Sequence, residues 1–246
     1  MQYVQTPVIA PGAPAAEADI AQVAAAIGDP SRAKVLLALA DGGVMPASAL
    51  AAEAGVSAST ISGHLTRLRE AKLLTVEHDG RHRYYRLAST DVARALEELA
   101  RIAQPLPVRS LRDSARARAL MRARLCYDHL AGRLGVALLA ALVDRGVLWH
   151  GDDCYQVTHE GFAALAAFGV NAAAFSGRRP AVRYCVDWAE RRHHLAGALG
   201  AAVTGRLFAL DWLRRGRSRR AVTLTEAGQA GLQETFGLPH DWAERS

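Results

Sequence analysis

The sequence has few cysteines and no long apolar stretch, and both shortages limit what the protein can be. Three cysteines among 246 residues are an odd number, so we expect no framework of structural disulfides, and the thiols are left for redox or metal chemistry. No uninterrupted run of about eighteen apolar residues occurs, and the N-terminus has no basic flank before an apolar segment. We therefore expect no transmembrane helix, no signal peptide, no membrane partner and a cytoplasmic protein.

The motifs of common enzyme classes are also missing. The sequence has no glycine-rich phosphate loop, no His-Glu-x-x-His pattern, no Gly-x-Ser-x-Gly elbow and no convincing pair of acids. We therefore expect no catalytic residues and no enzymatic activity. An enzymatic C-terminal domain remains a less favoured alternative.

Positive charge is present, but it is unevenly placed. The net charge is +6, yet residues 1–104 hold 10 lysines and arginines against 11 acids, whereas residues 105–246 hold 20 against 13. Binding to phosphates depends on where the bases lie rather than on their total number. The N-terminal part is basic only locally, at Arg67, Arg69, Lys72, Arg81, Arg83 and Arg86.

Residues 56–74 have the pattern of a recognition helix. Gly55 separates them from a short helical run over residues 47–54, and glycine accepts the left-handed backbone that ends a helix. Ser57 stands at the N-cap position, where its hydroxyl can accept a bond from a free N–H group. A narrow apolar stripe follows at helical spacing, formed by Ile61, Leu65 and Leu68.

The rest of this helix offers short hydroxyls and bases, which suit contacts to phosphates and to base edges. Residues 75–78 and 81–87 then read as two strands around Asp79-Gly80, which is a strong hairpin signal. Helix, turn, helix and basic hairpin together predict a winged helix-turn-helix. The expected DNA contacts are Ser57, Ser59, Thr60, Ser62, His64, Arg67, Arg69, Arg81 and Arg83.

Five short motifs, in this order, resemble the ArsR family of dimeric bacterial repressors. They are Ile-Gly-Asp-Pro-Ser-Arg-Ala-Lys-Val-Leu at 27–36, Leu-Ala-Ala-Glu-Ala-Gly-Val-Ser at 50–57, Thr-Ile-Ser-Gly-His-Leu at 60–65, Leu-Arg-Glu-Ala-Lys-Leu-Leu at 68–74 and the wing at 80–85. The resemblance covers about residues 19–103. It implies a repressor that leaves its operator when a metal, a thiol oxidant or a small ligand binds, and whose first and last helices form the dimer interface.

Two metal sites known in that family look absent. The stretch that resembles the Cys-containing motif ahead of the recognition helix is Gly-Val-Met-Pro-Ala-Ser at 43–48, without cysteine. The last helix of the domain has Asp91-Val-Ala93, where other members carry Asp-x-His, and no histidine is nearby. A signal is therefore expected to be sensed in the second domain.

The chain divides at Pro105 and Pro107, since proline removes N–H donors and disfavours helix in the residue before it. The expected fold is mainly α with small β-hairpin wings. The helix after the prolines is rich in arginine, and it reads either as a solvated linker or as an extra contact to DNA phosphates. The domains expected are a disordered lead over 1–18, the winged helix-turn-helix over 19–104, the linker helix over 105–125 and a C-terminal domain over 126–246.

The C-terminal domain contains an internal repeat, over residues 126–168 and 185–236. The stretch 129–148 matches 194–213 at nine of twenty positions. A hairpin-like stretch and then a Thr-x-x-Gly helix start follow in both copies. This predicts two winged-helix-like units packed together.

Each repeat begins with Cys-x-Asp, at Cys126 and at Cys185, and histidines His129 and His194 follow. Cys126 and His129 are three residues apart, a spacing that puts both on one face of a helix. Two cysteines and one or two histidines suit a soft ion such as zinc or copper(I). The thiols could instead form a redox switch, if Arg124 and Arg183 lower a thiol pKa, or they could be inert core residues. Cys154 receives no role.

These observations predict a sequence-specific DNA-binding transcription regulator. We expect a homodimeric repressor, released from its double-stranded operator by a metal or small-molecule inducer that the C-terminal domain senses. The alternative is a winged-helix DNA binder whose C-terminal domain serves only in assembly.

Overall fold

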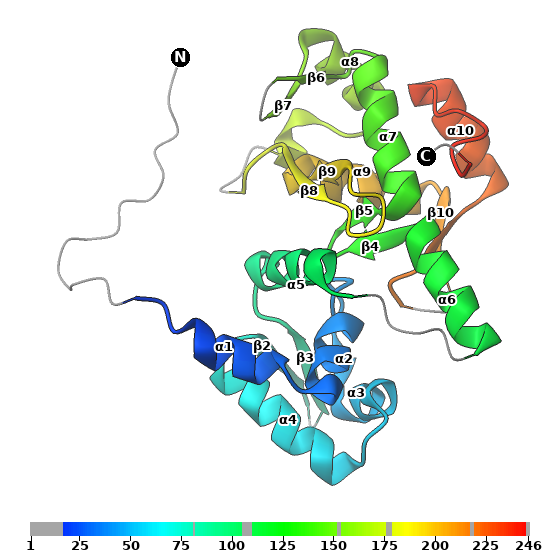
Figure 1. Cartoon of the computed structure of the whole chain (residues 1–246). Coiled ribbons are helices and arrows are strands. Elements are labelled where there is room, and N and C mark those ends of the chain that lie inside the picture. The colour runs from blue at the N-terminus through cyan, green and yellow to red at the C-terminus, as the bar shows by residue number, and fades with distance from the viewer. Residues whose placement is uncertain are drawn as a thin grey trace.

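The protein folds into two lobes, each with its own hydrophobic core (Figure 1). The computed structural model describes residues 17–80, 82–104, 110–151, 154–175, 179–216 and 219–244. Most of the expected disordered lead, residues 1–16, lies outside the described residues, as do Arg81 and residues 105–109 of the expected linker helix. Within the described ranges, none of the helices combines the length and the apolar character needed to cross a membrane.

The N-terminal lobe is the expected winged helix-turn-helix. Its sheet has the strand order β1-β3-β2, with antiparallel pairing throughout. The elements are α1 (Ile20–Ile27), α2 (Pro30–Ala38), β1 (Met45–Pro46), α3 (Ala47–Ala54), α4 (Ala58–Glu70), β2 (Leu74–Asp79), β3 (His82–Leu87) and α5 (Thr90–Ile102).

The turn between α3 and α4 forms as the sequence predicts. Gly55 ends α3 in the left-handed region, at φ +72°. The Ser57 hydroxyl caps α4 by accepting a hydrogen bond from the backbone N–H of Thr60 at 3.2 Å. The stripe of Ile61, Leu65 and Leu68 is buried, which fixes the side of α4 that faces the core. At α5 the cap is Ser89, whose hydroxyl accepts a hydrogen bond from the backbone N–H of Val92.

The C-terminal lobe shows one order of elements twice: hairpin, helix, hairpin, helix. It follows α6 (Leu111–Arg122), which Ser110 caps. The first half has β4 (Arg124–Cys126), β5 (His129–Ala131), α7 (Gly132–Asp144), β6 (Leu148–His150), β7 (Tyr155–Val157) and α8 (His159–Ala167). After η1 (Ala172–Phe175), the second half has β8 (Arg183–Val186), β9 (His193–Ala196), α9 (Gly197–Ala209), β10 (Leu213–Arg215), β11 (Val222–Leu224) and α10 (Glu226–Phe236).

The expectation that Cys126 and His129 share a helix face is wrong. The two residues are partners across the β4–β5 hairpin, and the turn between them holds Tyr127 at φ +63°. The linker helix also ends earlier than residue 125, because Ala123 is extended and Leu125 donates its N–H to the carbonyl of Arg220 at 2.8 Å. Pairing with a distant segment of the chain therefore draws this stretch out of helix.

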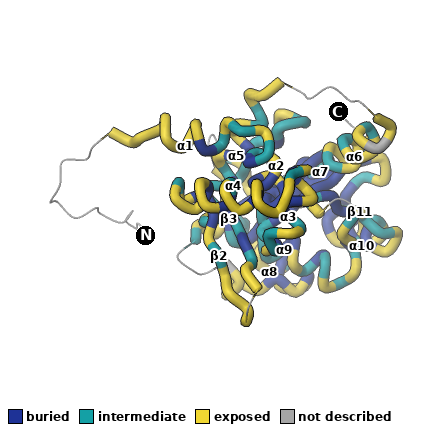
Figure 2. Tube along the Cα trace, turned by 90° about the horizontal axis from the view of Figure 1, so that it is seen from below, coloured by how far each residue is buried: buried dark blue, intermediate teal, exposed yellow. Residues whose placement is uncertain are grey.

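The two lobes are joined by polar contacts around the buried carboxylate of Asp41. Asp41, at the end of α2, pairs with Arg215 at 3.0 Å and with Arg219 at 3.3 Å, both from the β10–β11 hairpin. The Tyr127 N–H donates to the carbonyl of Ala40 at 2.8 Å. By contrast, α1 lies largely open to solvent, as Figure 2 shows. Its Ile20 and Val23 are exposed apolar side chains, as are Leu99 and Ile102 at the end of α5.

Candidate metal centre and DNA-binding surface

Two hairpins meet in the middle of the C-terminal lobe, where β5 contacts β9. Cys126 pairs with His129 across β4–β5, and Cys185 pairs with His194 across β8–β9. Directly opposed residues of an antiparallel pair project their side chains to the same face of the sheet. Each hairpin therefore presents one thiol and one imidazole side by side.

The four side chains converge on one point. One ligand atom from each of Cys126, His129, Cys185 and His194 can be chosen so that all four atoms lie within 4.8 Å of one another. Ligand atoms around a tetrahedral zinc ion, with bonds of about 2.0–2.3 Å, lie roughly 3.3–3.8 Å apart. Only a small contraction would therefore be needed to bind a metal ion.

Glycines at matching positions let the two halves approach closely. A Cβ atom added to Gly135 of α7 would lie 2.5 Å from the carbonyl oxygen of Leu130 and 3.5 Å from the Cβ of His194. The same atom on Gly200 of α9 would lie 2.8 Å from the carbonyl oxygen of Leu195 and 3.3 Å from the Cβ of His129. Each helix thus packs against the histidine that the opposite half contributes.

Several nitrogen atoms of this cluster have no hydrogen-bond partner. Among the described residues, Nε2 of His129 and both ring nitrogens of His194 are buried and find no hydrogen-bond partner, and the two rings stack at 5.3 Å. Buried polar atoms are nearly always satisfied in folded proteins. Unpaired imidazole nitrogens beside two sulfur atoms are the arrangement expected of ligands that bind a metal ion.

Asp128 fixes the ring of His129. Its Oδ1 lies 3.2 Å from Nδ1 of His129, and Arg179 holds the same carboxylate with two guanidinium nitrogens. Burial raises the pKa of Asp128, but the hydrogen bonds with His129 and Arg179 outweigh it and lower the pKa to about 2. A carboxylate on Nδ1 leaves Nε2 free for a metal, as in many carboxylate–histidine–metal arrangements.

The pKa values of the two thiols are shifted in opposite directions. The hydrogen bond from Cys126, and then His129, lower the pKa of Cys185 to about 5 against the effect of burial. The same hydrogen bond and complete burial raise the pKa of Cys126 well above its ordinary value. Cys185 is therefore the thiolate, and Cys126 keeps its proton.

The two histidines are also shifted in opposite directions. Burial lowers the pKa of His129, but the hydrogen bond with Asp128 and the neighbouring Cys185 outweigh it and raise the pKa overall. Burial and the neighbouring charge of His129 lower the pKa of His194 to about 3. The neutral His194 and the thiolate of Cys185 are ready to bind a metal without losing a proton.

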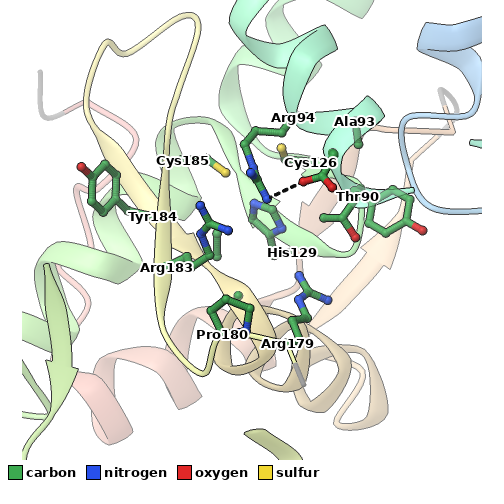
Figure 3. A pocket seen from close by; sticks show the side chains of 14 residues that line it. Thr90, Ala93, Arg94, Cys126, His129, Arg179, Pro180, Arg183, Tyr184 and Cys185 are labelled. Carbon is green, nitrogen blue, oxygen red and sulfur yellow. Dashed lines mark ion pairs between the residues drawn. The ribbon is translucent and has the colours of Figure 1, made fainter. Parts of the chain in front are cut away.

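A cavity of about 290 Å³ opens onto the cluster from the side of α5 (Figure 3). Cys126, His129 and Cys185 line it, whereas His194 does not. Figure 3 shows Arg94 of α5, Arg179 and Arg183 around the same opening. Cys185 is the partly exposed thiol, and Cys126 lies buried behind it.

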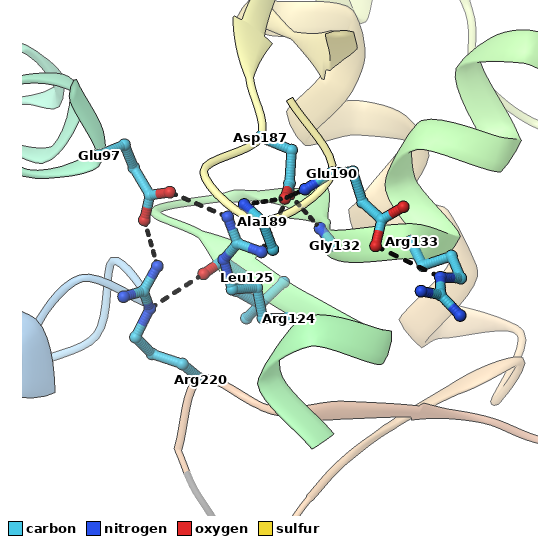
Figure 4. A network of polar contacts seen from close by, with 9 residues as sticks. All are labelled: Glu97, Arg124, Leu125, Gly132, Arg133, Asp187, Ala189, Glu190 and Arg220. Atoms are coloured by element: carbon cyan, nitrogen blue, oxygen red, sulfur yellow. Dashed lines mark hydrogen bonds and ion pairs between the residues drawn. The ribbon is translucent and has the colours of Figure 1, made fainter. Parts of the chain in front are cut away.

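A buried network of ion pairs links the cluster to α5 (Figure 4). Arg124, two residues before Cys126, lies 2.9 Å from Asp187 and 3.0 Å from Glu97 of α5. Asp187, two residues after Cys185, also accepts the N–H of Gly132 at 2.7 Å. Burial raises the pKa of Glu97, but Arg220 and Arg124 outweigh it and lower the pKa.

Sequence reasoning did not identify Glu97 as a site residue. A signal was available, because Glu97 shares the buried side of α5 with Ala93 and Leu96, where an acid must have a partner. The partners, Arg124 and Arg220, lie 27 and 123 positions further along the chain, so no local pattern indicates them.

The expected DNA-binding residues lie mostly on one open face of α4 and on the wing. Ser57, Ser59, Thr60, Ser62, Arg67, Arg69 and Arg83 are exposed. His64 differs, because its side chain is only 15% exposed and its Nδ1 lies 3.9 Å from Asp29, the N-cap residue of α2. Cys154 is exposed near β7, apart from the cluster.

Comparison with known proteins matches both lobes. A family described as a helix-turn-helix domain matches residues 27–77. The uncharacterized HTH-type transcriptional regulator YdfF of Bacillus subtilis (strain 168) is 42% identical over 221 residues, which are 89% of this chain and 98% of YdfF. The HTH-type transcriptional regulator CmtR of Mycobacterium tuberculosis is 40% identical over 86 residues, 35% of this chain and 72% of CmtR.

Two similar solved structures each cover about a third of this chain. The NMR structure of the cadmium metal-sensor CMTR from Mycobacterium tuberculosis covers 37% of this chain and 100% of its own, with 36% identity and a TM-score of 0.30. NolR from Sinorhizobium fredii covers 33% of this chain and 81% of its own, with 33% identity and a TM-score of 0.32.

Proposed function

The chain belongs to the HTH-type transcriptional regulators and carries the ArsR-type winged helix-turn-helix, and from this premise we propose that it is a cytoplasmic repressor released from DNA by a soft metal ion. The DNA-binding lobe would hold a double-stranded operator as a homodimer. The C-terminal lobe would sense the metal and would have no catalytic activity of its own.

The exposed face of α4 supports the contact with DNA. Short hydroxyls at its N-terminal end suit base edges in the major groove, and Arg67 and Arg69 suit phosphates. Arg83 on β3 extends the positive surface along the wing. His64 would have to turn away from Asp29 before it reached a base.

Exposed apolar side chains support the dimer. Ile20 of α1 is 75% exposed and Ile102 of α5 is 70% exposed, and Val23 and Leu99 lie on the same two helices. Large apolar side chains left open on neighbouring elements mark surfaces that another protein covers. A second copy of the chain is the partner that the two-fold symmetry of operators requires.

The convergence of Cys126, His129, Cys185 and His194 within 4.8 Å is the observation that carries the metal proposal. Two thiolates and two imidazoles suit zinc in tetrahedral coordination, and the thiolates also suit other soft ions. His129 Nε2 and one ring nitrogen of His194 would gain a partner that no residue in the described part of the chain provides.

The buried ion pairs offer a route from the metal to the DNA-binding lobe. Binding would draw the two hairpins together and would move Arg124 and Asp187, which flank the two cysteines. Arg124 holds Glu97 of α5, so the shift would reach a helix of the proposed dimer interface. Coupling between two sites of this kind typically amounts to about 1–3 kcal/mol.

A titration of the purified protein with zinc tests the proposal. We expect one zinc ion per chain and an operator affinity that falls roughly 5–150-fold when zinc is bound. Cys126→Ser and His194→Gln should lose both effects while they still bind operator DNA. Cys154→Ser, an exposed cysteine outside the cluster, is the matched control and should behave as the wild type. Zinc binding that survives loss of Cys126 and His194 would contradict the site.

A further inference from the structure

The cavity beside the cluster has a charge pattern that metal binding alone does not explain. A bare cation would be repelled by guanidinium groups, yet Arg94, Arg179 and Arg183 line the route by which Cys185 is reached. Arg179 is neutralised by Asp128, and Arg94 lies 3.2 Å from Asp91. Arg183 is exposed and forms no ion pair within the described part of the chain, so one guanidinium group stays without a carboxylate partner at the entrance.

The size of the cavity fits more than an ion. Its volume of about 290 Å³ corresponds to roughly ten water molecules at about 30 Å³ each. A small organic anion would fit there with its charged end near Arg183 and a sulfur atom near Cys185. The cavity wall is also chemically mixed, since Pro180, Tyr184 and Ala93 provide apolar surface beside the arginines.

The order in which the ligands can be reached is fixed by their burial. Cys185 is partly exposed to the cavity, Cys126 and His129 are almost completely buried, and His194 is fully buried. A metal ion that enters here meets Cys185 first and His194 last. An incoming ion therefore has to keep some of its previous ligands while it changes partners.

We propose that the cavity is a docking site for a small anionic thiol that delivers the metal as a thiolate complex. This inference rests on the proposed metal site and adds the class of molecule that loads it. The sulfur of Cys185 attacks the metal and one metal–sulfur bond to the carrier breaks, and Cys126 then displaces the second carrier thiolate. For a divalent ion with two carrier thiolates, the two leaving thiolates take up the protons of Cys126 and His129, so charge and atoms balance and nothing is oxidised.

The test compares carriers that differ in charge. Zinc is presented as its complex with mercaptoacetate, which is anionic, or with 2-mercaptoethanol, which is neutral, and the rate of loading of the full chain is followed. For each carrier, the loading rate of the wild type is divided by the loading rate of Arg183→Gln. This ratio cancels the difference in how fast the two carriers release zinc. Arg118→Gln serves as the matched control, because Arg118 of α6 does not line the cavity.

We expect Arg183→Gln to slow loading from mercaptoacetate about tenfold, in the range that electrostatic steering gives, and Arg183→Glu to slow it further. Loading from 2-mercaptoethanol and the equilibrium affinity for zinc should stay within about twofold, because Arg183 is not a metal ligand. Equal slowing for both carriers, or none for mercaptoacetate, would overturn the docking site and leave the metal site standing. Failure of the wild type to bind zinc at equilibrium would overturn both.

Discussion

At the residue scale, the protons on the four candidate ligands decide how metal binding depends on pH. The pKa of Cys185 is about 5 and that of His194 is about 3, so at about pH 6 both are already in the form that binds a metal. The pKa of Cys126 lies well above its ordinary value and that of His129 is raised above 6.5, so both still carry a proton.

Zinc binding at about pH 6 should therefore release about two protons per chain, since a metal binds only the deprotonated groups. Protons compete with zinc for the same atoms, so the affinity for zinc falls as the pH falls. Near pH 6 it should fall by about two orders of magnitude per pH unit. Calorimetry in buffers of different ionisation enthalpy measures the number released. A value near one would mean that either Cys126 or His129 does not bind the metal, and a value near zero that neither does.

The same residues show what spacing alone can and cannot predict. The sequence brought Cys126, His129, Cys185 and His194 together as candidates because the two repeats place them alike, and the structure brings all four within 4.8 Å. The local geometry expected for Cys126 and His129 was wrong. Residues three apart are neighbours on a helix, but they are also neighbours across a hairpin with a two-residue turn. The spacing fits both geometries, and the hairpin forms here because β4 pairs with β5.

At the scale of elements, the start of each long helix in the C-terminal lobe is held by a glycine that admits no side chain. Gly135→Ala would place a Cβ 2.5 Å from the carbonyl oxygen of Leu130, so the β5 strand or α7 must shift. We expect a loss of stability of about 1–3 kcal/mol, as overpacking usually costs, together with weaker zinc binding because His194 lies against the same atom.

Gly205→Ala in α9 is the matched control. A Cβ there meets nothing within 4 Å, and alanine favours helix over glycine by about 0.8–1.0 kcal/mol, so this variant should be more stable than the wild type. Chemical denaturation of both variants measures the two free energies of unfolding. Equal effects at the two positions would show that close packing of α7 does not shape the site.

The elements of the N-terminal lobe were predictable because their signals are local. Gly55, the Ser57 cap and the Ile61–Leu65–Leu68 stripe all act within one or two helical turns, and the structure contains each of them. The elements around the cluster were less predictable, because β4, β5, β8 and β9 are three or four residues long and derive their stability from each other. Strands this short leave almost no periodic pattern to recognise.

At the scale of the whole molecule, Glu97 is a buried acid of the N-terminal lobe that forms ion pairs with arginines of the C-terminal lobe. Glu97→Gln keeps the shape of the side chain but removes the negative charge that holds Arg124 and Arg220. We expect operator binding and zinc binding to persist, and the effect of zinc on operator affinity to shrink to less than about twofold. Fluorescence anisotropy of labelled operator with and without zinc measures this.

Glu98→Gln is the matched control on the same helix, because Glu98 is exposed and its ion pair, with Arg101 at 2.8 Å, lies within α5. A full zinc response in Glu97→Gln would show that coupling takes another path. The lowered pKa of Glu97 gives a second check, since its pairing stabilises the joined lobes above pH 4.5, its ordinary pKa, and is lost as the pH falls through the lowered value. Circular dichroism and scattering should then report loosening of the lobes in acid.

The division of the four ligands between two hairpins bears on how the protein matures on the ribosome. Cys126 and His129 are synthesised first, and by themselves they offer half of a tetrahedral site. The other half arrives with Cys185 and His194, after the segment between β5 and β8 has been made. Under the proposed function, a nascent chain would therefore bind zinc tightly only after both halves have emerged and met, and the proposed response to the metal would begin only with a completely folded C-terminal lobe.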